Sequence, residues 1–175
     1  ARPESTFGTR DAWARRGEPG LGRFDVPERL DAGQTAALRS AAIDLLSRAA
    51  ASDVPLLRAN AIEALALVPD RLVPAVRLGL GDRNRGVRFT AAMMVGRKRL
   101  TGLAPLVEPL LADRSGSVRA AAIFALDRCG RPVDPSPLSA MLVGPSVEER
   151  GNAAMVLGLM GDPSAASMLR SAYGR

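Results

Sequence analysis

One basic residue returns at a nearly constant interval through most of the chain. The recurring arginines, 30 or 31 residues apart, are Arg58, Arg88, Arg119 and Arg150. An alanine stands three residues after each of them, at Ala61, Ala91, Ala122 and Ala153. Self-similarity at a period of a few tens of residues is typical of a solenoid, in which each repeat packs only against its neighbours. The spacing therefore predicts a stack of similar units, an architecture that usually serves to hold other molecules.

The composition favours helices as the building elements of this stack. Of the 175 residues, 47% are apolar, but only six are aromatic, and alanine and leucine dominate the apolar set. A β-sandwich would need more Val, Ile, Thr and aromatic residues. An apolar stripe at helical spacing (Leu38, Ala41, Ala42, Leu45, Leu46 and Ala49) predicts a helix over 34–50 that caps the N-terminal end of the stack. Four repeats are expected to follow, at 52–82, 83–113, 114–144 and 145–175.

Each repeat is predicted to contain two helices. The first helices are expected over 54–67, 86–97, 116–128 and 146–159, and the second helices over 71–80, 101–112, 135–143 and 163–173. Gly130 and Gly161 stand where first helices end. Asp134-Pro135 and Asp162-Pro163 place an acidic cap before a proline, and Ser146 with Glu149 has the spacing of a capping box. One helix pair cannot bury its own apolar stripe, so we expect the pairs to form a right-handed stack.

Two central strings carry a family resemblance. They are D-R-N-R-G-V-R-F-T-A-A-M-M-V-G over 82–96 and D-R-S-G-S-V-R-A-A-A-I-F-A-L over 113–126. They resemble HEAT repeats, in particular the short bacterial type named after phycobilisome lyases. The resemblance covers about 52–175 and weakens at both ends. In the first repeat Leu57 stands for the Val before the recurring arginine, and in the last repeat Glu149 replaces that Val and Gly144 replaces the Asp. It implies an all-α protein, a right-handed α-solenoid of about four HEAT-like helix pairs over 33–175, with the second helices lining the concave side.

The resemblance implies no single activity. Similar proteins include scaffolds, chaperone-like lyases that attach bilin pigments, and DNA glycosylases, so the fold alone is a weak argument for function. The residues themselves argue against catalysis, because the chain contains no histidine and one cysteine, Cys129. No metal-ligand cluster or phosphate-binding glycine loop is recognisable either. We therefore expect no enzymatic activity, no metal and no cofactor. Cys129 shares its repeat position with Val68 and Met160 and is expected to be a buried small hydrophobe.

Residues 1–32 form an irregular, extended N-terminal arm in this interpretation, because prolines and glycines interrupt any helical period. The arm nevertheless contains three aromatic residues, Phe7, Trp13 and Phe24. They either dock on the solenoid, anchor a partner or are incidental. The chain begins at Ala1. Methionine removal, signal-peptide cleavage or excision from a longer chain would each explain that start, so the compartment stays open between the cytoplasm and an exported one. That the protein is bacterial is what the resemblance implies.

The charged residues have a structural and a functional interpretation. The recurring arginines begin first helices and follow closely behind Asp82 and Asp113 in the two central repeats. We interpret them as an Asp–Arg ladder that joins successive repeats. The net charge of +6 is concentrated between residues 70 and 100. The basic residues there that could meet a partner are Arg83, Arg85, Arg97, Lys98 and Arg99.

Geometry limits what this basic segment can bind. A helix of about 12 residues separates the first two of these residues from the last three by roughly 18 Å, which makes two small patches and no groove. They are solvated structural charges, contacts for an acidic protein, or a nucleic-acid surface. Two segments of the second helices, residues 103–111 and 137–143, carry little charge and no basic stripe. Their apolar residues either belong to the core or receive a protein segment, for which Glu108 and Met141 are candidates.

The sequence thus predicts a non-enzymatic scaffold or adaptor. It would bind a protein partner through the concave face and the N-terminal arm, as a subunit of a larger complex. One alternative is nucleic-acid binding through the basic patches, which would show steep salt dependence. The other alternative is a pigment-handling chaperone of the lyase type.

Overall fold

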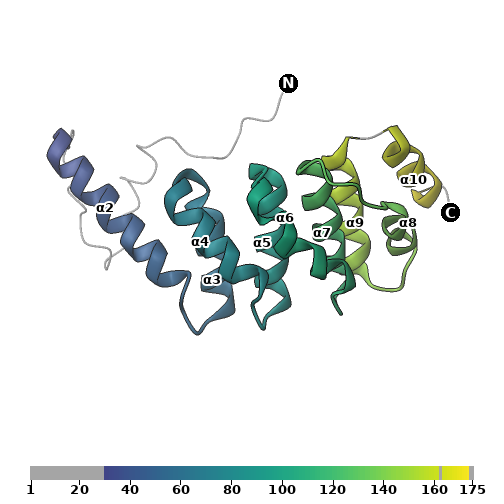
Figure 1. Cartoon of the computed structure of the whole chain (residues 1–175), viewed down its shortest axis with the longest axis horizontal. Helices are drawn as coiled ribbons and strands as arrows, with labels where there is room; N and C mark the ends of the chain where they lie inside the picture. The colour runs from purple at the N-terminus through teal and green to yellow at the C-terminus, as the bar shows by residue number, and fades with distance from the viewer. Residues whose placement is uncertain (1–29, 162, 174–175) are drawn as a thin grey trace, which may run out of the picture. The chain divides into compact units, whose positions relative to one another are not determined.

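The computed structural model describes residues 30–161 and 163–173. Every regular element in these ranges is a helix, and the chain divides into two units, Ala1–Thr35 and Ala36–Arg175. In the second unit α3 to α10 follow one another in chain order (Figure 1). The predicted all-α solenoid is therefore confirmed. No helix of the described ranges combines the length and apolar character that crossing a membrane requires.

The described helices alternate between long first helices and shorter second helices. The first helices are α3 (Pro55–Ala64) with the 3-10 turn η1 (Leu65–Leu67), α5 (Arg85–Lys98), α7 (Gly116–Arg128) and α9 (Val147–Met160). The second helices are α4 (Pro69–Leu80), α6 (Ala104–Val107) with η2 (Thr101–Leu103) and η3 (Glu108–Ala112), α8 (Ser136–Leu142) and α10 (Pro163–Tyr173). Ahead of them runs α2 (Ala32–Ala49).

A capping box starts α2 inside the first unit. The backbone N–H of Gln34 donates to the Asp31 carboxylate at 2.7 Å, and the backbone N–H of Asp31 donates to the Gln34 side chain at 3.1 Å. Both amides would otherwise lack a helical partner. The helix therefore begins at Ala32, two residues before the predicted start. The expected irregular arm, with Phe7, Trp13 and Phe24, lies outside the described residues apart from its last three positions.

Small residues at one repeat position let the first helices stack. Ala91, Ala122 and Ala153 are completely buried, and Ala61 is nearly so. Gly96 of α5 extends this close contact, because a Cβ atom there would lie 2.6 Å from a ring carbon of Phe124 and 3.1 Å from the Cα of Ala125. Interior packing leaves no room for that methyl group. The contact between α5 and α7 thus depends on a residue without a side chain.

The second helix predicted over 101–112 is wrong as a continuous α-helix. The structure divides it into η2, the single turn of α6, and η3. Pro105 and Pro109 explain the interruption, since proline lacks the N–H of the i to i−4 bond and its ring collides with the preceding turn. The segment still buries Leu103, Val107 and Leu110 against the first helices.

The first helices α5, α7 and α9 end beside a residue in the left-handed backbone conformation. For α7 and α9 that residue is the glycine predicted from the sequence. Gly161 terminates α9 with φ of 70°, and Gly130 follows α7 with φ of 71°. The equivalent position after α5 is occupied by Arg99, with φ of 50°, the one non-glycine residue in the described ranges with positive φ. A Cβ atom makes this conformation unfavourable. Arg99 therefore takes a strained backbone position that the two later repeats give to glycine.

Three local expectations need correction. Only Leu46 and Ala49 of the predicted α2 stripe are even half-buried; Leu38 and Leu45 are 56% and 59% exposed, so α2 does not cap the stack with this face.

Cys129 is half-buried, and burial raises the pKa of its thiol. Pro135 is the N-cap of α8, while the Asp134 carboxylate accepts from the Ser136 N–H at 2.9 Å.

Candidate interaction surfaces

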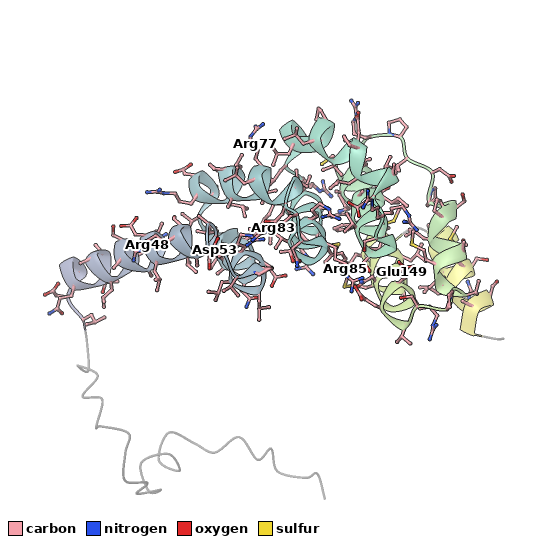
Figure 2. The ribbon with its side chains drawn as sticks, turned by 90° about the horizontal axis from the view of Figure 1, so that it is seen from below. Arg48, Asp53, Arg77, Arg83, Arg85 and Glu149 are labelled. Carbon is pink, nitrogen blue, oxygen red and sulfur yellow. The ribbon has the colours of Figure 1, made fainter. Side chains whose placement is uncertain are left out.

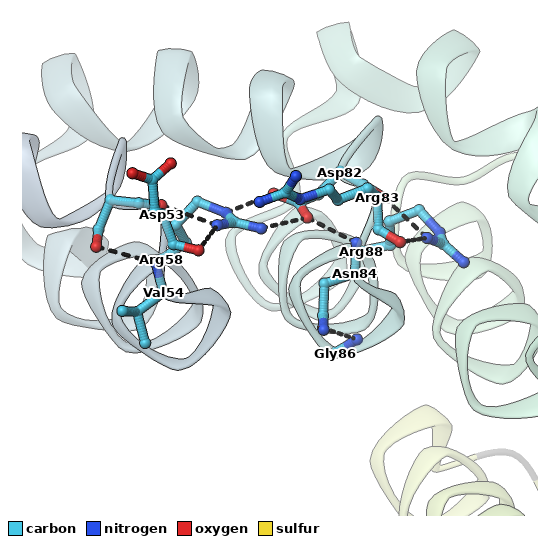
Figure 3. A network of polar contacts seen from close by, with 9 residues as sticks. Asp53, Val54, Arg58, Asp82, Arg83, Asn84, Gly86 and Arg88 are labelled. Carbon is cyan, nitrogen blue, oxygen red and sulfur yellow. Dashed lines mark hydrogen bonds and ion pairs between the residues drawn. The ribbon is translucent and has the colours of Figure 1, made fainter.

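Two of the four recurring arginines form ion pairs that link their own helix to the loop before the next first helix. Arg58 donates from Nε and Nη2 to the two carboxylate oxygens of Asp82, both at 2.7 Å. Arg88 makes the same paired contact with Asp113, at 2.7 and 2.9 Å (Figure 3 shows the part around Arg58 and Arg88). Both pairs are largely shielded from solvent, with side chains 8% to 18% exposed. Bidentate contacts between arginine and a carboxylate fix the relative orientation of the two side chains as well as stabilising the fold.

The same arginines also hold the loop that precedes their own helix. In all four repeats Nη1 donates to the carbonyl oxygens six and five residues earlier, beginning with Ser52 for Arg58 at 2.8 Å. The aspartates add a second tie, since Asp82 accepts from the Asn84 N–H at 2.7 Å and Asp113 from the Ser115 N–H at 2.9 Å. The loops before α5 and α7 are thus fixed from both sides.

The ion pairs set the ionisation of the ladder carboxylates. The hydrogen bond from Arg58 is the main reason why the pKa of Asp82 lies below its ordinary value. For Asp113, burial opposes ionisation, but the hydrogen bonds from Arg88 and the Ser115 N–H outweigh it and lower the pKa. Both aspartates therefore carry their charge in the folded protein over a wider pH range than an isolated carboxylate.

The ladder ends with the Arg88–Asp113 pair. Position 144, which corresponds to Asp82 and Asp113, is glycine. Arg119 keeps its bonds to the carbonyls of Asp113 and Arg114, but within the described ranges no carboxylate lies within ion-pair distance of it. A polar contact of another type takes over between α7 and α9.

Two adjacent glutamates of α9 contact the first turn of α7. The Glu149 carboxylate accepts from the Gly116 N–H at 2.9 Å, and the Glu148 carboxylate accepts from the Ser117 hydroxyl at 3.3 Å. Ser146 caps α9 through the Glu149 N–H, so only half of the predicted capping box forms, because the Glu149 side chain is engaged with Gly116. The repeat register alone marks position 149 as unusual, because Glu149 holds the place of the buried Val87 and Val118. Its partner is visible only in the structure, where Gly116 has no side chain to obstruct the carboxylate.

The basic residues singled out in the sequence do not form one surface. Arg85 begins α5 and is paired with Glu148 at 2.9 Å, while Arg83 is exposed in the preceding loop. Arg97, Lys98 and Arg99 are exposed at the other end of the same helix, and no ion pair in the described ranges includes them. Figure 2 shows Arg83, Arg85 and Glu149 together on one side, with Arg77 of α4 apart from them.

The second helices expose a series of aliphatic side chains. Leu78 of α4 is 74% exposed, Leu106 of α6 is 40%, and Val143 at the end of α8 is 51%. Exposed prolines accompany them, namely Pro74, Pro105, Pro109 and Pro137. We call this set the second-helix face. Exposed ionised groups on the same helices include Asp70, Arg71 and Arg77 of α4 and Glu108, which is paired with Arg131 at 2.8 Å. Met141 was a sequence candidate for this surface but is a core residue, only 7% exposed, because the register of α8 turns it inward.

A groove opens at the α4 end of this face. Ala50, Leu65, Pro74 and Leu78 supply apolar walls, and Asp70 and Arg71 supply the polar rim. The lining contains no aromatic side chain that could stack on a planar pigment. Arg71 is only weakly tied, at 3.9 Å from Asp44. Among the described residues no group of three His, Cys, Asp or Glu side chains gathers at metal-binding distance.

Comparison with known families agrees with this architecture. Residues 42–127 match the family model described as HEAT repeats; the match covers the last eight residues of α2 and continues through α3 to Asp127, near the end of α7. No curated protein matches the chain. HEAT repeats commonly serve as protein-interaction scaffolds and are typically non-catalytic. The match and the helical stack together support a HEAT-repeat family for this protein.

Proposed function

We propose that this chain is a non-catalytic scaffold or adaptor that holds a segment of a partner protein along the second-helix face. The observation that supports it most is the series of exposed aliphatic side chains, Leu78, Leu106 and Val143, on consecutive second helices. Single exposed leucines are ordinary, but a run of them on neighbouring elements is typical of an interaction site. The resemblance to HEAT repeats, in which the second helices line the concave side, supports the choice of this face.

The chemistry of the face favours a polypeptide over a nucleic acid. Tracking a phosphate backbone takes a continuous line of cations, and stacking bases takes aromatic rings. The second-helix face instead offers aliphatic groups and prolines beside isolated charges such as Arg71 and Glu108. An amphipathic helix or an extended segment could place alternate apolar residues on it. Phe7, Trp13 and Phe24 of the N-terminal arm are part of the same proposal as additional contacts.

The proposal is tested by comparing capture of partners by matched variants. Leu78→Ser with Leu106→Ser alters the second-helix face, and Leu56→Ser with Val147→Ser alters first-helix residues that are 67% and 74% exposed. Each tagged variant is incubated with native extract and bound proteins are quantified. A protein retained by the wild type and by the first-helix variant, but lost from the second-helix variant, is the expected result. Equal retention by both variants would reject the second-helix face as the binding surface.

A further inference from the structure

A second surface of different chemistry runs along the C-terminal ends of the first helices. The four residues at the ninth position after each recurring arginine are Leu67, Arg97, Arg128 and Leu159. Because α3, α5, α7 and α9 stack side by side in this register, these residues lie in sequence across the repeats. Together with Lys98 and Arg99 we call them the C-terminal edge.

The edge is basic in its centre and apolar at its ends. Arg97, Lys98 and Arg99 are exposed and Arg128 is half-buried, whereas Leu67 and Leu159 are 83% and 42% exposed. The carboxylates closest to the edge in sequence include Asp127, beside Arg128, and Asp70, three residues after Leu67; both are exposed. No ion pair within the described ranges includes any of the four cations of the edge.

Folding alone does not account for this arrangement. Cations near a helix C-terminus do interact favourably with the helix dipole. The helix dipole does not require three consecutive basic residues, however, and their like charges repel one another. Arg99 in addition holds a left-handed backbone conformation that Gly130 and Gly161 take without strain in the next two repeats. Strain and like-charge repulsion at the same place indicate a surface kept for binding.

We propose that the C-terminal edge binds an acidic protein segment with an apolar residue at each end. Its carboxylates would meet Arg97, Lys98, Arg99 and Arg128, and its terminal apolar side chains would contact Leu67 and Leu159. Charge complementarity selects the acidic class, and the exposed leucines at both ends distinguish a polypeptide from a phosphate backbone. The four neighbouring first helices are separated by three distances of about 10 Å each. An extended segment of about nine residues spans the resulting length.

The test uses a labelled peptide of about nine residues, with leucine at both ends and glutamate between. Binding to the full chain is followed by fluorescence anisotropy at low salt and then at increasing salt. Arg97→Ala with Lys98→Ala should weaken binding about tenfold. Arg83→Ala with Arg114→Ala removes two exposed cations from the opposite ends of the helices, and it should change the affinity less than about twofold. Circular dichroism verifies that both variants are folded.

Other outcomes would overturn the proposal. It is rejected if the peptide does not bind, or if both double variants lose affinity equally, since that would show general attraction to a basic protein. A single-stranded oligonucleotide of the same charge that binds more tightly than the peptide would assign the edge to nucleic acid. A peptide with serine in place of both leucines should bind several-fold more weakly, and equal affinity would remove the apolar contacts from the account. None of these results bears on the second-helix face, which lies on other helices.

Discussion

Arg88 of α5 donates two hydrogen bonds, at 2.7 and 2.9 Å, to the carboxylate of Asp113, which lies in the loop that leads into α7. The same guanidinium holds the carbonyls of its own loop. One side chain therefore fixes two consecutive loops relative to each other. The regular spacing of arginine along the sequence therefore corresponds to a contact that recurs along the stack.

Replacing Asp113 with Asn should show the value of the charge in this contact. The amide can still accept from the Ser115 N–H, so the turn is preserved while the ionic partner of Arg88 is lost. We expect the free energy of unfolding at neutral pH to fall by about 1–3 kcal/mol. Urea denaturation of wild type and variant measures the difference, and an unchanged midpoint would contradict a stabilising ladder.

The ladder should also make stability depend on pH in the acid range. The pKa values of Asp82 and Asp113 are lowered in the folded chain. Their contribution is therefore fully present above the unfolded value of about 3.9 and is lost as the pH falls through the lowered folded values. The difference in unfolding free energy between wild type and Asp113→Asn should shrink below about pH 4. A difference that stays constant down to full protonation would show that the charge of Asp113 is not responsible.

Gly144→Asp should extend the ladder by one step. The register places this side chain opposite Arg119, and a Cβ atom at Gly144 would meet its nearest neighbour at 3.4 Å, an ordinary contact. We expect a stabilisation of about 0.5–1.5 kcal/mol, from the ion pair and from the loss of glycine freedom in the unfolded chain. The gain should fall in an Arg119→Gln background and for Gly144→Asn. Equal gains in all three would leave only the effect of glycine removal.

Much of this architecture could be predicted from the sequence, because its determinants are local and periodic. The bounds of α7 agree with the prediction, and the glycine stops at Gly130 and Gly161 are in place. What failed depends on tertiary partners. The stripe of α2 gave no indication that Leu38 and Leu45 would stay exposed, and the contact of Glu149 with Gly116 joins residues 33 positions apart. Arg99 could have been found, since the repeat period aligns it with two glycines.

Gly96→Ala should destabilise the contact between α5 and α7. The added methyl group would collide with the ring of Phe124 and approach the Ala125 backbone, so we expect a loss of about 1–3 kcal/mol. The control is Gly158→Ala in α9, where a Cβ atom meets nothing within 4 Å. There helix propensity alone should add about 0.5–1 kcal/mol. Thermal unfolding of both variants gives the comparison, and shifts in the same direction would contradict the close packing described for Gly96.

Arg99→Gly should stabilise the fold and weaken the C-terminal edge together. Relief of the left-handed strain is expected to raise the unfolding free energy by about 1 kcal/mol, because glycine adopts positive φ freely. The same change removes one of the cations proposed to hold an acidic peptide. A rise in Tm with unchanged peptide affinity would show that the strain serves no binding role.

The most direct test of the central claim is photocrosslinking from single positions in cells that naturally express the protein. A benzophenone amino acid replaces Leu106 on the second-helix face or, as the control, Leu56 on α3, which is 67% exposed. The account predicts a discrete crosslinked protein from position 106 and none from position 56. A partner that crosslinks from position 56 alone, or equally from both, would contradict the second-helix face as the surface that holds it.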